Sequence, residues 1–228
     1  MISAAGLVML AEPVLCFDTC SLLDIMRDPS RDTVRVPDRI AGLELLEAAE
    51  AGRLQCFLPE QVATEFNEHD LSTQDEAERA IKRLQEQVDR INALDAVYGT
   101  ANAVDLAHLD DHIGRARGIV DRWLARLKVF KPGDGAPAKA FARVNTATPP
   151  ATKGKESSKD CLVYETVLEL ASGLRKARTA TPIVFLSSNT NEYLLERKSL
   201  KPEIAAEFAP LKVDYAQNMS LAKHLLGL

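Results

Sequence analysis

The chain has 228 residues, of which 46% are hydrophobic and 27% charged, and its formal net charge is −5. This composition excludes a disordered or fibrous protein, and no uncharged run approaches the roughly 18 apolar residues of a membrane-spanning helix. The N-terminal apolar stretch has no basic residue before it and Glu12 after it, which is not typical of a signal peptide. We therefore expect a cytoplasmic protein with no membrane partner.

The charge is distributed unevenly along the chain. Residues 1–110 have 9 basic and 21 acidic side chains, residues 111–159 have 11 and 4, and residues 160–228 have 8 and 8. A basic middle segment, with a net charge of +7, therefore lies between an acidic and a neutral one. Such a segment is a candidate contact for nucleic acid in a protein that is acidic overall.

The first third of the chain predicts two strands, each followed by a helix. Val14–Phe17 is a short apolar run that stops at Asp18, where a helical pattern begins. Residues 40–51 have apolar side chains at helical spacing, and Cys56–Leu58 is a second short strand. Pro59 then opens the next helix, because proline is favoured in a first helical turn.

The middle of the chain predicts a long helical hairpin followed by a loop. One helix is expected over Gln74–Tyr98 and a second from about Ala103 to Phe130, which gives a hairpin over about 74–130. We expect the apolar faces of the two helices to pack on each other; the alternative is that they form a dimer or partner surface. Residues 131–159 are rich in Pro, Gly, Ala, Thr and Lys, and predict a long basic loop.

The last third predicts further strands separated by helices. Asp160 starts a helix, Ile183–Leu186 is an apolar run of the kind that is buried on both faces of a parallel sheet, and a last strand lies near Leu211–Tyr215. A short helix over Leu221–Leu226 closes the chain. This order predicts one α/β domain over residues 1–228, a three-layer α/β/α sandwich with a central parallel sheet.

Acidic and polar residues follow the predicted strands, where ligands bind in open parallel sheets. Asp18 follows the first strand, Glu65 lies in the helix after the second, and Asp160 heads the helix before the third. Ser188, Asn189 and Glu192 follow the third strand. Acids that meet at one sheet edge repel one another unless a cation neutralises them, and oxygen ligands suit Mg²⁺ or Mn²⁺.

Each of these residues also has an ordinary structural explanation. Asp18 and Asp160 are both candidate helix N-caps, Glu65 is a candidate solvated helix residue, and Asn189 a candidate turn residue. Only their joint placement points to a metal site. Other site types are not supported, because the chain has no phosphate-binding glycine loop, and a His pair at i, i+4 lacks the glutamate of a zinc protease.

Four segments resemble, in family order, the motifs of the PIN domain superfamily of metal-dependent nucleases. They are LCFDTCSLLD (15–24), LPEQVATEF (58–66), KGKESSKDCLVYETVLELA (153–171) and IVFLSSNTNEY (183–193). The likeness is greatest to a subgroup with a long helical hairpin between the second and third motifs. The resemblance implies that Asp18, Glu65 and Asp160 bind the metal, with Thr19 a hydroxyl beside the first acid.

The fourth motif departs from the commonest family pattern. Many relatives have an aspartate directly after the strand, whereas this chain has Ser188 and Asn189, and Glu192 is the nearest carboxylate. Asn189 is able to ligate through its amide oxygen or orient a water. The resemblance therefore implies the catalytic acids Asp18, Glu65, Asp160 and Glu192, with Asn189 as a further metal ligand.

The resemblance implies an endoribonuclease that uses Mg²⁺ or Mn²⁺ and leaves a 5′-phosphate and a 3′-hydroxyl. Thr19, Ser188 and three lysines before Asp160, Lys153, Lys155 and Lys159, are the candidate RNA contacts. Many relatives are toxins, so an antitoxin or other inhibitor protein is a further candidate partner. The alternatives are a non-catalytic RNA-binding or regulatory module and a DNA or flap nuclease.

Overall fold

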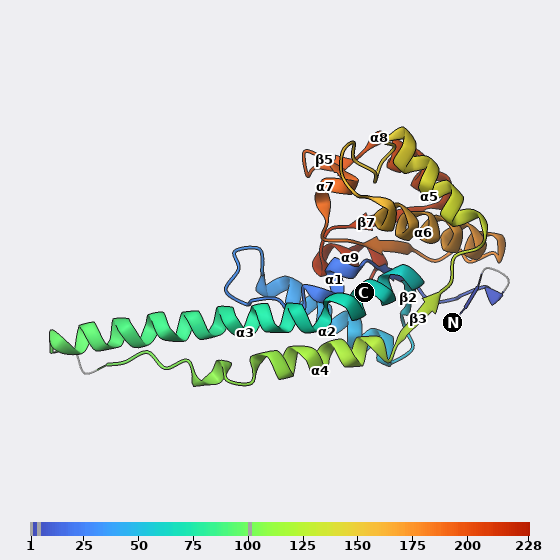
Figure 1. Ribbon diagram of the computed structural model, residues 1–228. Coiled ribbons are helices and arrows are strands. Elements are labelled where there is room, and N and C mark those ends of the chain that lie inside the picture. Colours follow the sequence, from blue (N-terminus) through green and yellow to red (C-terminus); the bar gives the residue numbers. More distant parts are fainter. Residues whose placement is uncertain (1, 4–5, 100–101) are drawn as a thin grey trace.

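The structure is a computed structural model that describes residues 2–3, 6–99 and 102–228. Across these residues a five-stranded sheet has the order β3-β2-β1-β4-β7, and all its neighbouring strands are parallel. The strands are β1 (Val14–Phe17), β2 (Gln55–Pro59), β3 (Leu127–Phe130), β4 (Ile183–Leu186) and β7 (Val213–Ala216). Helices cover both faces, so the expected α/β/α sandwich is confirmed (Figure 1).

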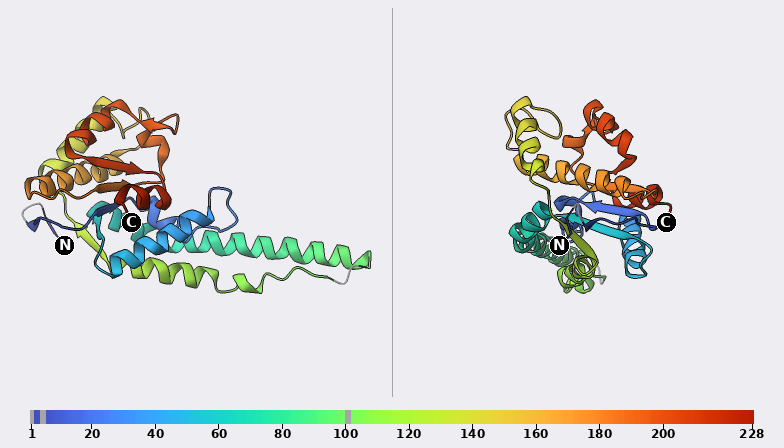
Figure 2. Two further views of the ribbon diagram at one scale, coloured as in Figure 1. Left: turned by 180° about the vertical axis from the view of Figure 1, so that it is seen from behind. Right: turned by 90° about the vertical axis from the view of Figure 1, so that its right-hand side faces the viewer.

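The helices divide between the two faces of the sheet. α6 and α8, with α5 packed on α6, lie on one face, and α2, α4 and α9 lie on the other (Figure 2). Among the described residues, no helix is both long enough and apolar enough to span a bilayer. The elements are α1 (Thr19–Leu23), α2 (Val36–Glu50), α3 (Glu60–Val97), a 3₁₀ turn (Ala107–Leu109), α4 (His112–Leu124), α5 (Gly135–Thr146), α6 (Ser158–Lys176), α7 (Thr190–Tyr193), a small hairpin of β5 (Leu194–Leu195) and β6 (Ser199–Leu200), α8 (Pro202–Leu211) and α9 (Met219–Leu226).

The central strands β1 and β4 explain where the site lies. Every residue of the two strands is at most 1% exposed, as their unbroken apolar runs predict. Phe17 at the end of β1 pairs with Leu186 at the end of β4. The next residues, Asp18 and Ser187, therefore leave the sheet at the same level and side by side.

The predicted hairpin over about 74–130 is wrong in its boundaries. α3 is one helix of 38 residues from Glu60, because no glycine or proline interrupts it before Val97. It projects as an arm with α4 alongside (Figure 1). The connection through Thr100 and Ala101 lies outside the described residues. The second half is not one helix, because α4 ends at Leu124 and the chain continues into the edge strand β3.

The predicted loop over about 131–159 is also wrong in part, because it contains the helix α5. Alanine is the strongest helix former, and Pro137 lies in the first turn, where proline is tolerated. Ala136 and Ala140 are buried, and Arg143 forms ion pairs with acids of α6 and α8. Small residues that suggest a flexible loop thus let α5 pack closely on α6. Within this range, irregular chain remains over residues 131–134 and 147–157.

Candidate active site

Asp18 is the most firmly held of the predicted acids. It follows β1 directly, is 8% exposed and caps α1. Its Oδ1 accepts a hydrogen bond from the Thr19 backbone N–H at 2.7 Å, and its Oδ2 accepts from Ser187 Oγ at 2.5 Å and from Cys20 Sγ at 3.1 Å. Burial raises the pKa of Asp18, while these three donors oppose that shift by stabilising the carboxylate.

The loop after β4 is fixed in the same way. Tyr215 Oη donates to the Ser187 carbonyl at 2.7 Å, and the Ser188 N–H donates to Ser21 Oγ at 3.2 Å. The strand order of the sheet reverses between β1 and β4, which makes their carboxyl ends the switch point at which open α/β sheets bind ligands. Asp18 therefore lies at this point, and so does Ser188, which is a predicted substrate contact.

Glu65 comes to the same place from α3. Its Oε2 accepts from Thr19 Oγ1 at 2.7 Å, and its Oε1 accepts from Gln61 Nε2 at 2.9 Å. Thr19 thus connects two predicted metal ligands, since its backbone N–H donates to Asp18 and its hydroxyl to Glu65. The negative charge of Glu65 adds to the raised pKa of Asp18. The predicted role of Thr19 as a direct substrate contact is not tested by this geometry.

Asp160 and Glu192 are half-buried acids that lie close to each other. Burial raises the pKa of Asp160 to about 8, with further contributions from the negative charges of Glu192, Asp18 and Glu65. Burial also raises the pKa of Glu192, to which Asp18 adds, while the Asn189 side chain opposes the shift. Asp160 is therefore close enough to the other three carboxylates of the predicted catalytic set for each of them to raise its pKa.

Asp160 is not the helix cap that its position also allowed. The N-cap of α6 is Ser157, so Asp160 lies inside the first turn with its carboxylate free for another role. Asn189 is the N-cap of α7, but its side chain makes no capping hydrogen bond. The capping explanation therefore holds for Asp18 alone.

The donor set fits a divalent cation. Glu192 Oε2 is buried and has no hydrogen-bond partner within the described ranges, which leaves an acceptor that a cation would satisfy. In the same part of the chain, no three Asp, Glu, His or Cys side chains lie close enough together to form a complete metal shell. Mg²⁺ keeps several waters and binds through one or two carboxylates plus substrate phosphates, so this wider arrangement suits it.

The three predicted lysines have different surroundings. Lys159 Nζ pairs with Glu68 Oε2 of α3 at 3.0 Å, on the protein surface. Lys153 and Lys155 are exposed in the loop before α6. Burial is the main cause that lowers the pKa of Lys201. The positive charge of Lys155 lowers it further, and the negative charge of Glu192 opposes the shift. Lys201 is thus a further cation close to the acids.

The sequence interpretation assigned no role to Ser187, Cys20, Gln61 or Lys201. Ser187 carries a usable signal, because it follows β4 at the position where Asp18 follows β1. Gln61 lies four residues before Glu65, the spacing at which helical side chains meet. Cys20 is a free thiol two residues after Asp18. Lys201 follows a small hairpin that the sequence does not predict.

A family model described as PIN domain matches residues 15–193. The matched range begins just before Asp18 and ends just after Glu192, so it contains all four acids. No curated protein and no solved structure matches the chain. The match leaves the subgroup with a long helical hairpin as a prediction.

Proposed function

The chain belongs to the PIN domain family, whose members are generally nucleases, and we propose that it is an endoribonuclease that uses Mg²⁺ or Mn²⁺. The carrying observation is the gathering of four carboxylates beside the ends of β1 and β4: Thr19 connects Asp18 to Glu65, and the pKa of Asp160 is raised by the negative charges of Asp18, Glu65 and Glu192. Buried acids of like charge destabilise a fold, so their retention at a ligand-binding edge favours a chemical role.

A divalent cation bound there supplies activation of a water for in-line attack on a phosphodiester and stabilises the leaving oxygen. The protein's own residues fix the donors in advance. Ser187, Cys20 and the Thr19 N–H hold Asp18, while Thr19 Oγ1 and Gln61 hold Glu65. Ligands oriented by such partners lose less freedom on binding a metal.

Asp160 and Glu192 complete the proposed metal site, with Asn189 as a neutral oxygen ligand beside them. The raised pKa of Asp160 means that it holds a proton near neutral pH until a cation displaces it. Metal binding is therefore expected to release a proton and to strengthen as the pH rises through about 8.

Five side chains are proposed to contact RNA. Lys153, Lys155 and Lys159 precede Asp160 and would meet phosphates, and Thr19 and Ser188 offer hydroxyls at the sheet edge. Lys159 must leave Glu68 to do so, and an exposed ion pair of this kind is weak enough to exchange.

The test is cleavage of a labelled single-stranded RNA, and of DNA of the same sequence, with Mg²⁺, Mn²⁺ or EDTA. We expect metal-dependent RNA cleavage that leaves a 5′-phosphate, and none from Asp160→Asn, with Asp75→Asn on the surface of α3 as the control. RNA that is bound but uncut would favour the non-catalytic module. Preferential cleavage of DNA would favour the DNA nuclease.

A further inference from the structure

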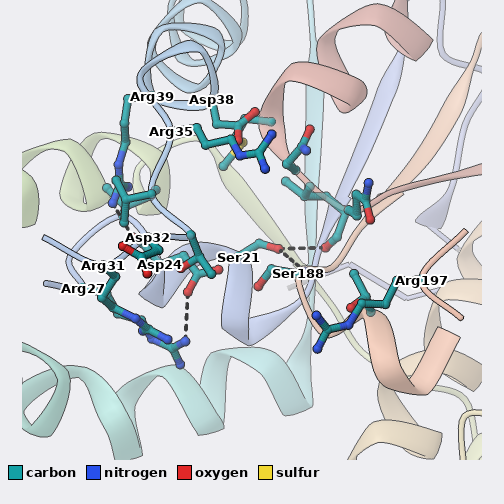
Figure 3. A pocket seen from close by; sticks show the side chains of 18 residues that line it. Ser21, Asp24, Arg27, Arg31, Asp32, Arg35, Asp38, Arg39, Ser188 and Arg197 are labelled. Atoms are coloured by element: carbon teal, nitrogen blue, oxygen red, sulfur yellow. Dashed lines mark hydrogen bonds and ion pairs between the residues drawn. The ribbon is translucent and has the colours of Figure 1, made fainter. Parts of the chain in front are cut away.

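A cleft of about 540 Å³ opens beside the candidate active site. The segment from α1 to α2, the residues after β4 and the start of α9 form its walls (Figure 3). Its charged side chains are five arginines and three aspartates: Arg27, Arg31, Arg35, Arg39, Arg197, Asp24, Asp32 and Asp38. Four of the five arginines lie in residues 1–110, a segment that is strongly acidic overall.

Two of the arginines are used by the protein itself. Arg27 pairs with Asp24 at 3.0 Å, and Arg39 Nη2 donates to the Asp24 carbonyl at 2.7 Å. Arg39 is half-buried, and burial lowers its pKa. These two residues hold the segment between α1 and α2, and Arg27 also neutralises the Asp24 carboxylate.

The other three arginines are available to a ligand. The exposed guanidinium groups of Arg31 and Arg35 make no hydrogen bond or ion pair with any residue that the structure describes. Arg197 has only a long contact, from Nε to Asn191 Oδ1 at 3.4 Å. Figure 3 shows Arg35 and Arg197 on either side of Ser188, while Arg31 lies farther along the cleft, near Arg27 and Asp32.

The cleft adjoins the acidic site through the residues at the end of β4. Ser21 and Ser188 line it and are hydrogen-bonded to each other, and Ser21 Oγ donates to the Leu186 carbonyl at 3.3 Å. Ser187, next along the chain, donates to Asp18. A strand with one phosphate at the acids therefore has its neighbouring phosphates within reach of the cleft.

The basic middle segment offers fewer free cations than its charge suggests. Several of its cations pair with acids from elsewhere in the chain: Arg117 with Asp70, Arg122 with Glu50, Arg143 with Glu165 and Glu207, and Lys159 with Glu68. Phosphates that approach the acids need nearby positive charge, and the cleft supplies it.

We infer that Arg31, Arg35 and Arg197 bind backbone phosphates of the RNA strand beside the scissile bond, an inference that rests on the proposed function. Guanidinium groups bind phosphate oxygens in pairs, which fixes the position of the strand as well as attracting it. The first turns of α2 and α9 also line the cleft and add partial positive charge. An RNA strand is favoured over an acidic protein segment because Ser188, which lines the cleft, is the next residue after Ser187, the hydrogen-bond partner of Asp18.

The test compares Arg31→Ala/Arg35→Ala/Arg197→Ala with Arg79→Ala/Arg83→Ala/Arg90→Ala, which removes the same charge from the exposed face of α3. Binding of a fluorescent 12-nucleotide RNA is measured against salt with Mn²⁺ present, in an Asp160→Asn background that prevents turnover. Each lost phosphate contact changes the log–log salt slope by about 0.7, so the cleft variant should lose about 2 and the α3 variant none. In the active background, the cleft variant should raise KM at least tenfold with little change in kcat.

Other results would overturn the inference in recognisable ways. An unchanged slope in a folded cleft variant, with cleavage intact in the parent, refutes the inference and leaves the proposed function standing. A parent protein that binds RNA through the cleft but never cleaves it refutes the nuclease instead. Selective loss of polyglutamate binding, with RNA affinity unchanged, assigns the cleft to an acidic protein partner.

Discussion

Replacement of Asp160 by Asn should stabilise the metal-free protein at alkaline pH while abolishing cleavage. Burial and three neighbouring acids raise the pKa of Asp160 from its ordinary 3.8 to about 8. Between these two values the folded protein holds a proton that the unfolded chain has lost, so stability falls as the pH rises and the loss is complete above about pH 8. Asn has nearly the same size and carries no charge, so it removes this destabilisation.

The size of the effect follows from the change in pKa. One pKa unit corresponds to about 1.4 kcal/mol, so the change from 3.8 to about 8 sets an upper bound of about 6 kcal/mol. Asp160 is partly exposed and shares its interaction with Glu192, and solvent screening reduces the expected gain to about 1–3 kcal/mol. At pH 4 the gain should be close to zero, because Asp160 is then protonated in the folded state.

Urea unfolding in EDTA at pH 4.5 and pH 8.5 measures this difference, with Asp75→Asn on the exposed face of α3 as a matched control. At pH 8.5, Mn²⁺ should then stabilise the parent more than it stabilises Asp160→Asn. In the parent the cation neutralises the Asp160 carboxylate, which the variant lacks. An equal free energy of unfolding for parent and variant at pH 8.5 in EDTA would refute the crowding of carboxylates around Asp160.

Three further predictions test the remaining parts of the interpretation. Asp18→Asn should abolish the rise in melting temperature that Mn²⁺ produces in the parent, measured by calorimetry, and an equal rise in both proteins would remove Asp18 from the metal site. Glu192→Gln should need more Mg²⁺ for half-maximal cleavage than Asn189→Ala; the reverse order in a metal titration would make Asn189 the stronger ligand. Arg143→Ala should lower the free energy of unfolding by about 3–5 kcal/mol, because it leaves Glu165 buried and unpaired; urea unfolding that shows less than about 1 kcal/mol would contradict that role.

The sequence predicted those parts of the fold that local patterns determine. The unbroken apolar runs of β1 and β4 identify central strands, because only strands that are buried on both faces lack polar alternation. The position of the acids could be predicted for a related reason, since the carboxyl ends of parallel strands meet at one edge of the sheet. Asp18 and Glu65 accordingly lie on the two sides of Thr19.

The errors arose where tertiary packing overrides local composition. β3 is an edge strand with an exposed Lys128 and half-buried neighbours. Its sequence alone does not distinguish it from a continuation of α4, and only its pairing with β2 makes it a strand. α5 has small residues typical of a loop, but its buried alanines and Arg143 hold it against α6. Both features depend on contacts between segments that are distant in the chain.

The distribution of unpaired positive charge also depends on contacts between segments that are distant in the chain. The basic segment 111–159 has the largest positive sum, yet residues such as Arg122 and Arg143 form ion pairs with acids from other segments, so much of that charge is neutralised within the fold. The segment 1–110 has a negative net charge, yet its Arg31 and Arg35 are exposed to solvent without a partner among the described residues. The field that a phosphate meets is set by which charges remain unpaired at the surface. The cleft that adjoins the end of β4 contains such unpaired arginines. The cleft variant, with the α3 variant as its control, therefore tests RNA binding more directly than the net charge of any segment does.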